Sequence, residues 1–588
     1  MDPLSAIPPP EPLPNLFFAR CEKDAEQIAS YTKVDGRWVG TTWRQSRLAV
    51  EETALGLVEL GANKGTPIGI LSNTRREWGQ ADLAIIAIGG ITIGIYPTLT
   101  GPQTRQLLEL SNARIVFVED RAQRVKVEEA CEGLEPPVQF VTMAPHADGR
   151  RTITLDELRR RGAKRRQQNP EELTRRVEEL RSEDPVSYIY TSGTTGDPKG
   201  AMLSHRNFHY TAHATNALID YGGERALAFL PYAHSLQRYA SYLPLITSME
   251  AYFAESFDKV RENLREVRPT VFALVPRVLE KIHAKAMAVG AGRIELQRRI
   301  FDGSLGVMRA VGRVRRDGGV PGLRERLLAR AADRVVGSRI RERMGGRVKF
   351  IGSGGAPLAR ETHEFFEDIG IPILEGYGLT ETCAPATVNT LEMRRIGTVG
   401  RPLPGTDVKI AKDGEILIRG PGVFSGYFEN EAATKAAFDD QGWFKSGDIG
   451  HMSRDGFLTI TDRKKDIIVT AGGKNIAPQP IENELKRHGL VGQVVVIGDR
   501  RPYLTALIGI DPEQKDDLPK DAREQIERHV AEVNARHPSF EQVKRFEVLD
   551  DEMTIESGLL TPTLKVKRRV VDERYADAIE HLYSDKTR

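Results

Sequence analysis

The residues with the clearest chemistry lie in one stretch, from Tyr190 to Gly200, which reads YTSGTTGDPKG. Its glycines let the backbone turn sharply and bring N–H groups close to a ligand, and its hydroxyl side chains and lysine can bind anionic oxygens. Such a loop suits a polyphosphate. It is not a Walker A loop, because Gly200 follows Lys199 where a Ser or Thr would hold magnesium. An ordinary turn would be the better interpretation of three Gly, Ser or Thr residues in a row. For eleven residues in this order, a ligand-binding loop is the better interpretation.

Two further segments could bind the rest of a nucleotide. In IGSGGAPL (351–358), small residues after an apolar strand would let a flat ring lie against bare backbone, although alone this could be any tight turn. In LEGYGLTET (374–382), Tyr377 offers an aromatic face for a purine, Thr380 a hydroxyl for phosphate and Glu381 a carboxylate oxygen for magnesium. The second segment is the more specific of the two.

A carboxylate and a guanidinium follow in the next segments, SGDIG (446–450) and DRKKDIIVTA (462–471). Asp448 can accept hydrogen bonds from both ribose hydroxyls, and Arg463 can donate to ribose or phosphate oxygens. In isolation, an Asp in a turn is usually a cap and an Arg usually a surface charge. Their place in the series favours the functional interpretation.

Taken together, these segments resemble the adenylate-forming superfamily, which contains acyl-CoA synthetases, luciferases and peptide-synthetase adenylation domains. The resemblance runs from about residue 40 to about residue 570. Within the superfamily, the chain looks most like the bacterial long-chain fatty-acid CoA ligases. It implies a two-step reaction that uses ATP, Mg²⁺ and coenzyme A. A fatty carboxylate attacks the α-phosphorus of ATP to give acyl-AMP and pyrophosphate, and the CoA thiolate then displaces AMP.

The resemblance also implies a role for each matching residue. It places ATP at Thr191, Ser192, Gly193, Thr194, Thr195, Gly196, Lys199, Gly355, Ala356, Pro357, Glu375, Gly376, Tyr377, Gly378, Thr380, Asp448 and Arg463. It makes Lys565, Glu381, Thr191 and His234 catalytic residues, with Glu381 also the metal ligand. Without the resemblance, Lys565 would be a surface lysine and His234 a structural histidine.

The resemblance further places a hinge at Lys465 and a passage for the pantetheine arm of CoA at Gly472, Gly473 and Lys474. Lys565 and the 472–474 loop belong to the same small domain but serve different half-reactions. Both can act on one centre only if that domain reorients between the two steps. We therefore expect Lys565 to be needed for adenylate formation and dispensable for thioester formation.

The elements that must position these residues follow from the hydrophobic pattern. Apolar runs at 68–71, 91–95, 115–119, 138–141 and 186–190 alternate with helical patterns at 78–88 and 103–110, which predicts a mostly parallel sheet covered by helices. Ligands of such sheets bind at the carboxyl ends of the strands. Beyond about residue 464, strand-like 494–497, 504–510 and 545–549 and a helix through Ile526, Val530 and Val533 predict a compact α+β domain.

The predicted fold class is therefore α/β, with a large multi-lobed N-terminal domain and a small mobile α+β C-terminal domain. The expected divisions are a proline-rich extended arm at 1–14, an adenylation domain at 15–463 with a basic helical insertion at about 285–345, and a lid domain at 464–588. Residues 156–184 are a charged, helix-prone connector whose basic runs, 159–161 and 164–166, are typical of a solvated face.

Charge and cysteine content restrict the partners. The chain has 84 basic and 82 acidic residues, which argues against a general nucleic-acid binder, and three cysteines without a CxxC pair, which points to a reducing cytoplasm. No apolar run is long enough to span a membrane. Residues 293–343 contain fourteen arginines against six acidic residues, in amphipathic helices that could rest on an anionic membrane or be ordinary surface helices. The sequence leaves open whether the chain forms a homodimer.

Several alternative functions share these motifs. An acyl-adenylate ligase that loads a carrier protein would differ from a fatty-acid CoA ligase only in the acceptor of the acyl group. A ligase for another hydrophobic carboxylate would differ only in the acid that it activates. A luciferase-like oxygenase also adenylates its substrate, but no sequence feature demands oxygen chemistry. A non-catalytic binding protein should have lost key residues, whereas Thr191, Glu381, Asp448, Arg463 and Lys565 are all present. The acyl chain length cannot be inferred from the sequence.

Overall fold

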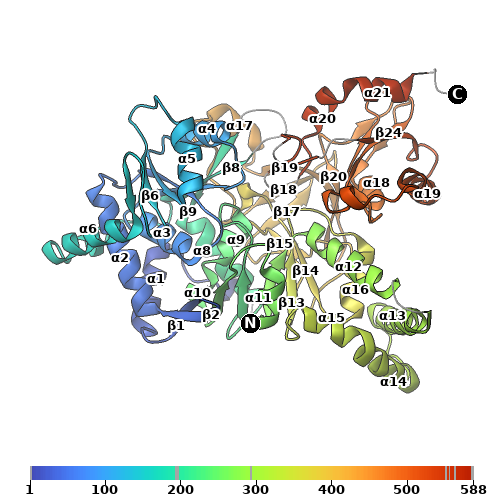
Figure 1. The fold of residues 1–588 in the computed structure, drawn as a ribbon, viewed down its shortest axis with the longest axis horizontal. Helices are drawn as coiled ribbons and strands as arrows, with labels where there is room; N and C mark the ends of the chain where they lie inside the picture. The colour runs from blue at the N-terminus through green and yellow to red at the C-terminus, as the bar shows by residue number, and fades with distance from the viewer. Residues whose placement is uncertain are drawn as a thin grey trace.

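The fold was analysed in a computed structural model, which describes residues 3–191, 198–291, 295–549, 553–554, 557–561 and 565–584. The chain forms two large sheets, a small antiparallel sheet and a separate C-terminal unit (Figure 1). The predicted α/β class with mostly parallel sheets is confirmed. In the described part of the chain, no helix is both long and apolar enough to cross a membrane.

The first large sheet has seven strands, and its central strands are parallel. Their order is β7 (Thr152–Thr154), β6 (Gln139–Thr142), β5 (Ile115–Val118), β3 (Pro67–Leu71), β4 (Ile91–Ile95), β8 (Pro185–Thr191) and β9 (Lys199–Ser204). These strands are almost continuously apolar because helices cover both faces of the sheet. Every strand expected between residues 68 and 190 is present.

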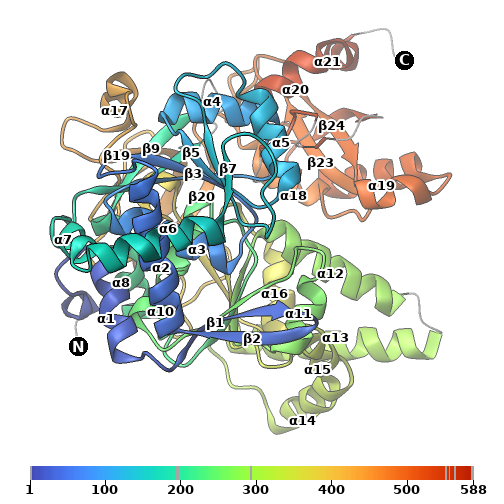
Figure 2. The ribbon, with the colours of Figure 1, turned by 60° about the vertical axis from the view of Figure 1, so that its left-hand side comes forward.

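Two groups of helices cover this sheet on opposite faces (Figure 2). One group contains α2 (Trp43–Glu59), α3 (Arg76–Ala87), α6 (Leu155–Gln168) and α7 (Glu172–Glu178), and the other contains α4 (Gly101–Ser111) and α5 (Arg121–Ala130). The basic runs of α6 are only partly solvated. Arg165 pairs with Glu172 at 2.6 Å and Arg166 with Glu51 on α2 at 3.0 Å, so these arginines hold the connector against the domain.

The second large sheet has nine strands and carries the nucleotide segments. Its order is β16 (Arg401–Pro402), β15 (Thr387–Val388), β14 (Ile373–Tyr377), β13 (Phe350–Ser353), β12 (Val271–Leu274), β10 (Arg225–Ala228), β11 (Glu250–Phe253), β1 (Ile28–Val34) and β2 (Arg37–Thr42). Its helices are α8 (His205–Leu218), α9 (Ser235–Ala240), α10 (Leu243–Ile246), α11 (Val260–Val267), α12 (Pro276–Ala291) and α16 (Arg360–Asp368).

A third, four-stranded antiparallel sheet leads into the C-terminal unit. It contains β17 (Asp407–Ile410), β18 (Glu415–Arg419), β19 (Phe444–Met452) and β20 (Leu458–Arg463), and α17 (Glu431–Ala437) flanks it. Helix α1 (Leu13–Lys23) lies far upstream in the sequence. The C-terminal unit contains β21 (Ile468–Val469), β22 (Asn475–Ile476), α18 (Pro478–Leu485), β23 (Val491–Ile497), β24 (Leu504–Ile510), η4 (Pro512–Asp517), α19 (Ala522–Asn534), β25 (Val543–Leu549), α20 (Arg568–Arg574) and α21 (Ala576–Tyr583). The predicted strands and helix of this unit are present, and its own apolar core includes Ile526, Val530 and Val533.

The arginine-rich insertion is helical, as its periodicity predicts. It comprises α13 (Glu295–Arg316), α14 (Leu323–Ala332), a π-helical turn η2 (Asp333–Gly337) and α15 (Ser338–Arg343). The apolar row of α13 (Phe301, Leu305 and Met308) is buried against α16. The row on α14 and η2 is instead largely exposed, at Leu323 and Leu327 on α14 and at Val335 on η2, so the insertion presents an apolar surface to solvent.

The extended N-terminal arm expected at residues 1–14 is a partly wrong prediction. Residues Pro3–Ala6 form a short 3-10 helix beside α8, and α1 already begins at Leu13. Leu13 is fully buried, and its N–H donates to the buried His205 at 3.2 Å. The prolines start α1 at a position where a missing N–H has no cost, and burial of the following apolar side chains then outweighs the extended preference of the proline run.

Candidate active site

The hydroxyl-rich loop connects two strands of the first sheet. Strands β8 and β9 are antiparallel, and Thr191 lies opposite Lys199 at the end of the hairpin where the loop connects the two strands. The Lys199 ammonium lies 5.5 Å from the centre of the Tyr427 ring. The predicted phosphate-binding residues Ser192, Gly193, Thr194, Thr195 and Gly196 lie outside the described residues. Lys199, the first residue of β9, therefore lies beside Tyr427.

Tyr427 connects this loop to the predicted magnesium ligand. Its hydroxyl donates to Oε1 of Glu381 at 2.8 Å, and Glu381 is only 8% exposed on the short helix η3 (Thr380–Thr382). The second oxygen of Glu381 makes no hydrogen bond to the described residues. No group of three or more acidic, His or Cys side chains that could hold a metal occurs among those residues. One free carboxylate oxygen fits Mg²⁺, which takes few protein ligands and completes its shell with substrate phosphates and water.

The two predicted base-binding segments lie side by side. Strands β13 and β14 are parallel, with Ile351 opposite Ile373. Gly354 passes so close to β14 that an added Cβ would lie 2.9 Å from the Gly376 carbonyl oxygen, so only glycine fits. Gly355, Gly376, Tyr377 and Gly378 line one end of a cavity. Glycine backbone on both sides leaves room for a flat ring.

Glu375 lies in the same segment but has a different environment. Its carboxylate is buried and lies 2.8 Å from Nδ1 of His363 on α16. The side chain thus ties β14 to the helix beside it. A part for Glu375, Ala356 or Pro357 in ATP binding stays a prediction.

The residues predicted to bind the ribose come together from three strands. The Tyr377 hydroxyl donates to Oδ2 of Asp448 at 2.7 Å, and Arg463 Nε lies 3.3 Å from the other oxygen. Asp448 on β19 and Arg463 on β20 are directly opposite each other in the antiparallel register. This pairing orients the buried Asp448 carboxylate, whose lone pairs can still accept from a diol. Tyr377, Asp448 and Arg463 are brought together as the sequence predicts.

Lys565 reaches this group from the C-terminal unit. Its side chain is exposed, but protein crowds its ammonium, and desolvation, followed by the charge of Arg463, lowers its pKa to about 8. The carboxylates of Asp448 and Glu381 oppose that shift. Lys465, between β20 and β21, has a pKa lowered by desolvation and by Arg463. At neutral pH, Lys565 is therefore mainly an ammonium that can give up its proton more readily than a free lysine.

His234 lies within electrostatic range of Lys565 and caps α9. Its Nδ1 accepts from the N–H of Leu236 at 3.2 Å, so the hydrogen of the neutral ring sits on Nε2. Desolvation, together with the nearby charge of Lys565, lowers its pKa to about 4. His234 is therefore a neutral donor at physiological pH and not a second cation.

The predicted CoA residues are not brought to this group. Gly472, Gly473 and Lys474 form the tip of the β21–β22 hairpin and are exposed. Gly473 has a φ of +73°, and the Lys474 ammonium lies 5.5 Å from the ring of Phe540, in the same unit. This orientation thus presents Lys565 to the nucleotide site and leaves the hairpin outside it.

Ion pairs hold the C-terminal unit in this orientation. Arg277, near the start of α12, lies 2.8 Å from Asp511 after β24, and also donates to the Val491 carbonyl oxygen at 3.3 Å. Arg487 lies 3.5 Å from Glu361 on α16. These contacts join α12 and α16 to the C-terminal unit and would have to break if it reoriented.

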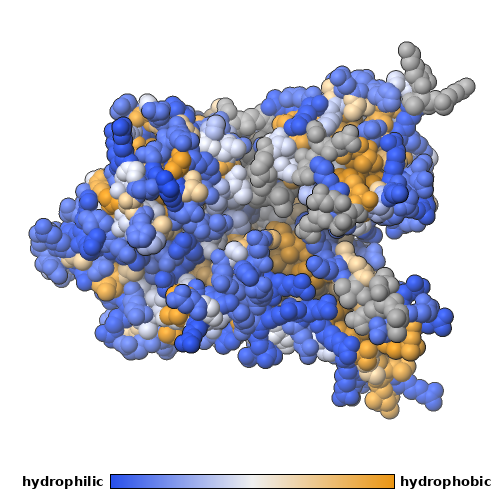
Figure 3. Space-filling model, viewed as in Figure 1, coloured by the Kyte–Doolittle hydropathy of each residue, from blue (hydrophilic) through white to orange (hydrophobic). Residues whose placement is uncertain are grey.

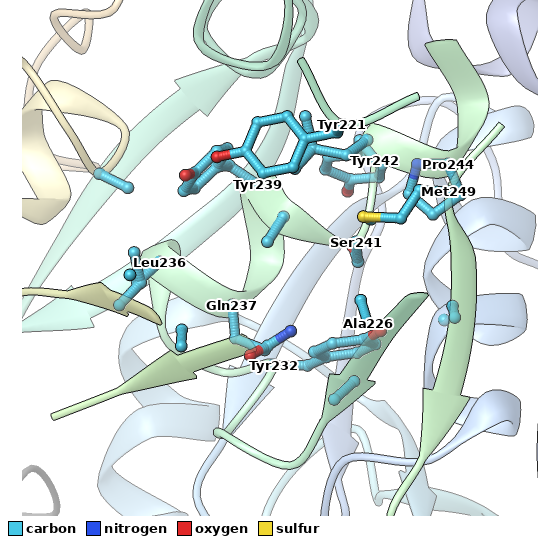
Figure 4. A pocket seen from close by; sticks show the side chains of 18 of the residues that line it. Tyr221, Ala226, Tyr232, Leu236, Gln237, Tyr239, Ser241, Tyr242, Pro244 and Met249 are labelled. Carbon is cyan, nitrogen blue, oxygen red and sulfur yellow. The ribbon is translucent and has the colours of Figure 1, made fainter. Parts of the chain in front are cut away.

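A deep apolar cavity continues from the glycine segments past His234. Apolar side chains from seven elements line it, and Figure 4 shows several of them. They include Phe17, Trp43, Val50, Leu83, Leu227, Leu236, Leu243, Leu245, Met249 and Phe253. None of these residues was predicted from the sequence to line a cavity, because they converge from α1, α2, α3, β10, α9, α10 and β11 without a local signal. An alkyl chain attached to a carboxylate at His234 would fit this lining.

A buried ion pair supports the wall of the cavity. Arg238 on α9 is fully buried and donates from Nε to Asp82 on α3 at 3.2 Å. Tyr242 donates to the same carboxylate at 2.6 Å, and Arg238 also reaches Ser187 on β8 at 2.9 Å. Because both charges are paired and hydrogen-bonded, the network can persist in the interior and fix α9 relative to both sheets. This pair could not be predicted from the sequence either, because its members are 156 residues apart.

Comparison with known families covers most of the chain. Residues 17–428 match the family described as AMP-binding enzyme, and residues 465–587 match the AMP-binding enzyme C-terminal domain. The chain is 39% identical to the long-chain-fatty-acid–CoA ligase FadD15 of Mycobacterium tuberculosis, over 97% of this chain and 96% of that protein. It is 30% identical to the long-chain-fatty-acid–CoA ligase ACSBG2 of Xenopus laevis, over 98% and 84%.

Solved structures share the fold at low sequence identity. The anthranilate CoA ligase AuaEII in complex with anthranoyl-AMP has a TM-score of 0.75 at 19% identity and covers 98% of this chain and 99% of its own. The O-succinylbenzoate CoA synthetase MenE of Bacillus subtilis, in complex with ATP and magnesium, has a TM-score of 0.67 at 22% identity over 94% and 98%. Both coverages extend through the small C-terminal unit.

Proposed function

The chain belongs to the family of AMP-binding enzymes, and from this premise we propose that it is an AMP-forming fatty-acid CoA ligase acting on long-chain substrates. It converts a fatty carboxylate and ATP to acyl-AMP and pyrophosphate, and then transfers the acyl group to CoA. The observation that carries the proposal is the continuous cavity that joins the nucleotide segments at Gly376 and Gly378 to an apolar interior beyond His234. The curated relatives support the long-chain assignment.

In the first step, this site offsets the repulsion between two anions. The Lys565 ammonium can lie between the substrate carboxylate and the α-phosphate and stabilise the charge that grows as they join. Neutral His234 can donate its Nε2 hydrogen to a carboxylate oxygen without adding a charge. Asp448 and Arg463 hold the ribose. Glu381 is the residue that would hold Mg²⁺, which when bound would neutralise phosphate charge.

In the second step, a different part of the C-terminal unit serves the same centre. We assign the hairpin 472–474 to the pantetheine arm of CoA, since bare glycine backbone leaves space for a thin ligand, and Lys465 to the pivot. The three cysteines are free and buried, and burial raises the pKa of Cys383 to about 12, so we give none of them a role as acyl carrier.

The activity is tested by measuring pyrophosphate release with carboxylates of 2 to 20 carbons, with and without CoA, and by identifying the acyl product. The proposal predicts the highest kcat/KM with long-chain acids and an acyl-CoA product. Accumulation of acyl-AMP with no CoA product would instead indicate a ligase that loads a carrier protein. Absence of pyrophosphate release with every acid would refute the assignment.

We also propose that the enzyme works in the cytoplasm and contacts anionic membranes through its helical insertion. Figure 3 shows apolar side chains gathered at the lower right of the molecule, over α13 and α14. Val320 is 78% exposed and Leu323 73%, and exposed Leu327 and Leu328 follow on the same helix. The surrounding arginines would add attraction to anionic lipid headgroups of about 1 kcal/mol each.

Membrane contact is tested by flotation with vesicles of phosphatidylcholine alone or mixed with phosphatidylglycerol. Binding to the anionic vesicles at low salt, reduced in Leu323→Glu, is expected. If the protein ignores both kinds of vesicle and instead dimerises through this surface, the membrane proposal is wrong and a homodimer takes its place.

A further inference from the structure

Two of the polar side chains in the cavity wall that have no hydrogen-bonding partner in the described part of the chain lie close to each other in sequence. They are the amide of Gln237 on α9 and the hydroxyl of Tyr232, in the segment just before it. Gln237 is 9% exposed and Tyr232 4%, and both line the cavity. Figure 4 shows them on the same side of the pocket. Buried amides and hydroxyls are normally paired, so a polar ligand atom is expected here.

Some other polar groups of the same wall already have hydrogen-bonding partners within the protein. The Tyr242 hydroxyl donates to Asp82, and Ser241 donates to the Arg238 carbonyl oxygen at 2.6 Å. The side chains of Tyr221 and Tyr239 lie close enough to influence each other's pKa, across the pocket from Gln237. These groups present closed networks to the cavity. The hydrogen-bonding capacity of Gln237 and Tyr232 remains directed into the open space.

The position of this pair relates it to one part of the substrate. His234, which faces Lys565, caps α9, and Gln237 follows it by three residues, or about one helical turn. Tyr232 precedes His234 by two residues and is held by the edge of the Trp78 ring, 5.2 Å between centroids. The pair therefore lies close to the carboxyl end of a bound acyl chain and not at its far end.

We propose that Gln237 and Tyr232 form a subsite for a hydroxyl or carbonyl oxygen on one of the first carbons of the acyl chain, so that oxygenated fatty acids are preferred substrates. This inference rests on the proposed ligase function. An amide and a phenol can each donate and accept, which matches a substrate hydroxyl. An unsubstituted methylene chain leaves both groups unpaired, and a site built to bond an oxygen rejects the analogue that lacks it.

The test compares kcat/KM for 3-hydroxydodecanoate and dodecanoate by pyrophosphate release. In the unaltered enzyme, the hydroxy acid is expected to be favoured about tenfold, as one satisfied hydrogen bond provides. In Gln237→Leu, which keeps the volume and removes the polar group, the ratio should fall to near one. Tyr232→Phe should lower this kcat/KM ratio in part. It provides a second test of the subsite in case Gln237→Leu folds poorly.

Ser241→Ala is the matched control, because its hydroxyl is already bonded to backbone, and its ratio should stay at the unaltered value. An equal ratio in the unaltered enzyme and in Gln237→Leu would overturn the subsite and would mean that water satisfies these groups. If neither acid nor any other carboxylate releases pyrophosphate, the proposed function itself falls and the subsite with it. Turnover of dodecanoate with an unchanged ratio overturns the subsite alone.

Discussion

Two segments of the C-terminal unit, the one that carries Lys565 and the hairpin 472–474, differ in where a single orientation of that unit places them. Lys565 lies within electrostatic range of Asp448, Glu381 and His234. The hairpin is exposed and contacts Phe540 of its own unit. With the roles proposed for Lys565 and the hairpin, this orientation suits adenylate formation and not thioester formation. The proposal therefore requires the unit to move for the second step.

The largest difference between the two half-reactions is expected when the Lys565 ammonium is removed. Lys565→Ala should slow acyl-AMP formation by about 10²–10³-fold, the range found when a preorganised donor to developing charge is lost. Thioester formation from supplied acyl-AMP and CoA should remain largely intact. Both rates are measured in single-turnover assays. An equal loss in the two assays would mean that Lys565 supports the site as a whole.

The reverse experiment alters the hairpin. Gly473 has a φ of +73°, which a β-branched residue adopts only with strain, although no atom lies within 4 Å of an added Cβ. Gly473→Val should slow thioester formation by about 10-fold to 100-fold and spare acyl-AMP formation. Gly36→Val, at a φ of +76° with equally open space, is the control for backbone strain. A loss of adenylate formation in Gly473→Val but not in the control would contradict the division of labour.

The two half-reactions should also separate with pH. Lys565 acts as an ammonium with its pKa lowered to about 8, so it is charged below that pH and loses its proton above it. Acyl-AMP formation should then fall about tenfold per pH unit above pH 8. Thioester formation should rise over the same range, because the CoA thiolate is the nucleophile. Lys565→Arg should flatten the first profile, and parallel profiles for both steps would argue against this role.

The smallest effect is expected at the ion pair that holds the unit. Arg277 and Asp511 join α12 to the C-terminal unit at 2.8 Å. The Arg277 side chain is 24% exposed, so water can replace it beside Asp511. Arg277→Ala should therefore cost about 1 kcal/mol at most and slow acyl-AMP formation by about twofold to fivefold without slowing the second step. Arg160→Ala, which removes a surface pair with Glu157, should change neither rate. A larger effect on thioester formation would reverse the assignment of this orientation.

Much of the nucleotide site could be predicted because its residues lie in short continuous motifs. Tyr377, Asp448, Arg463 and Lys565 were each named from the sequence, and the structure brings them together. Tyr427, which orients Glu381, was not found, because an isolated tyrosine after an apolar segment has no distinguishing pattern. Its role depends on the approach of β9 to η3, which local sequence does not specify.

The acyl cavity could not be predicted for a related reason. Its wall takes residues from elements hundreds of positions apart, and the Arg238–Asp82 pair that supports it has no spacing rule. Composition also misled at the N-terminus, where a proline run predicts an extended arm but Leu13 is fully buried in α1. In both places tertiary packing decides the outcome, and the local pattern is a weak guide.

The most direct test of reorientation is to prevent it. Because the three native cysteines are buried, Arg277→Cys and Asp511→Cys can be joined selectively by a short, reducible bifunctional reagent. We predict that the cross-linked enzyme releases one equivalent of pyrophosphate and retains acyl-AMP, forms no acyl-CoA, and recovers full turnover after reduction. Formation of acyl-CoA at the normal rate while the cross-link is intact would contradict the account.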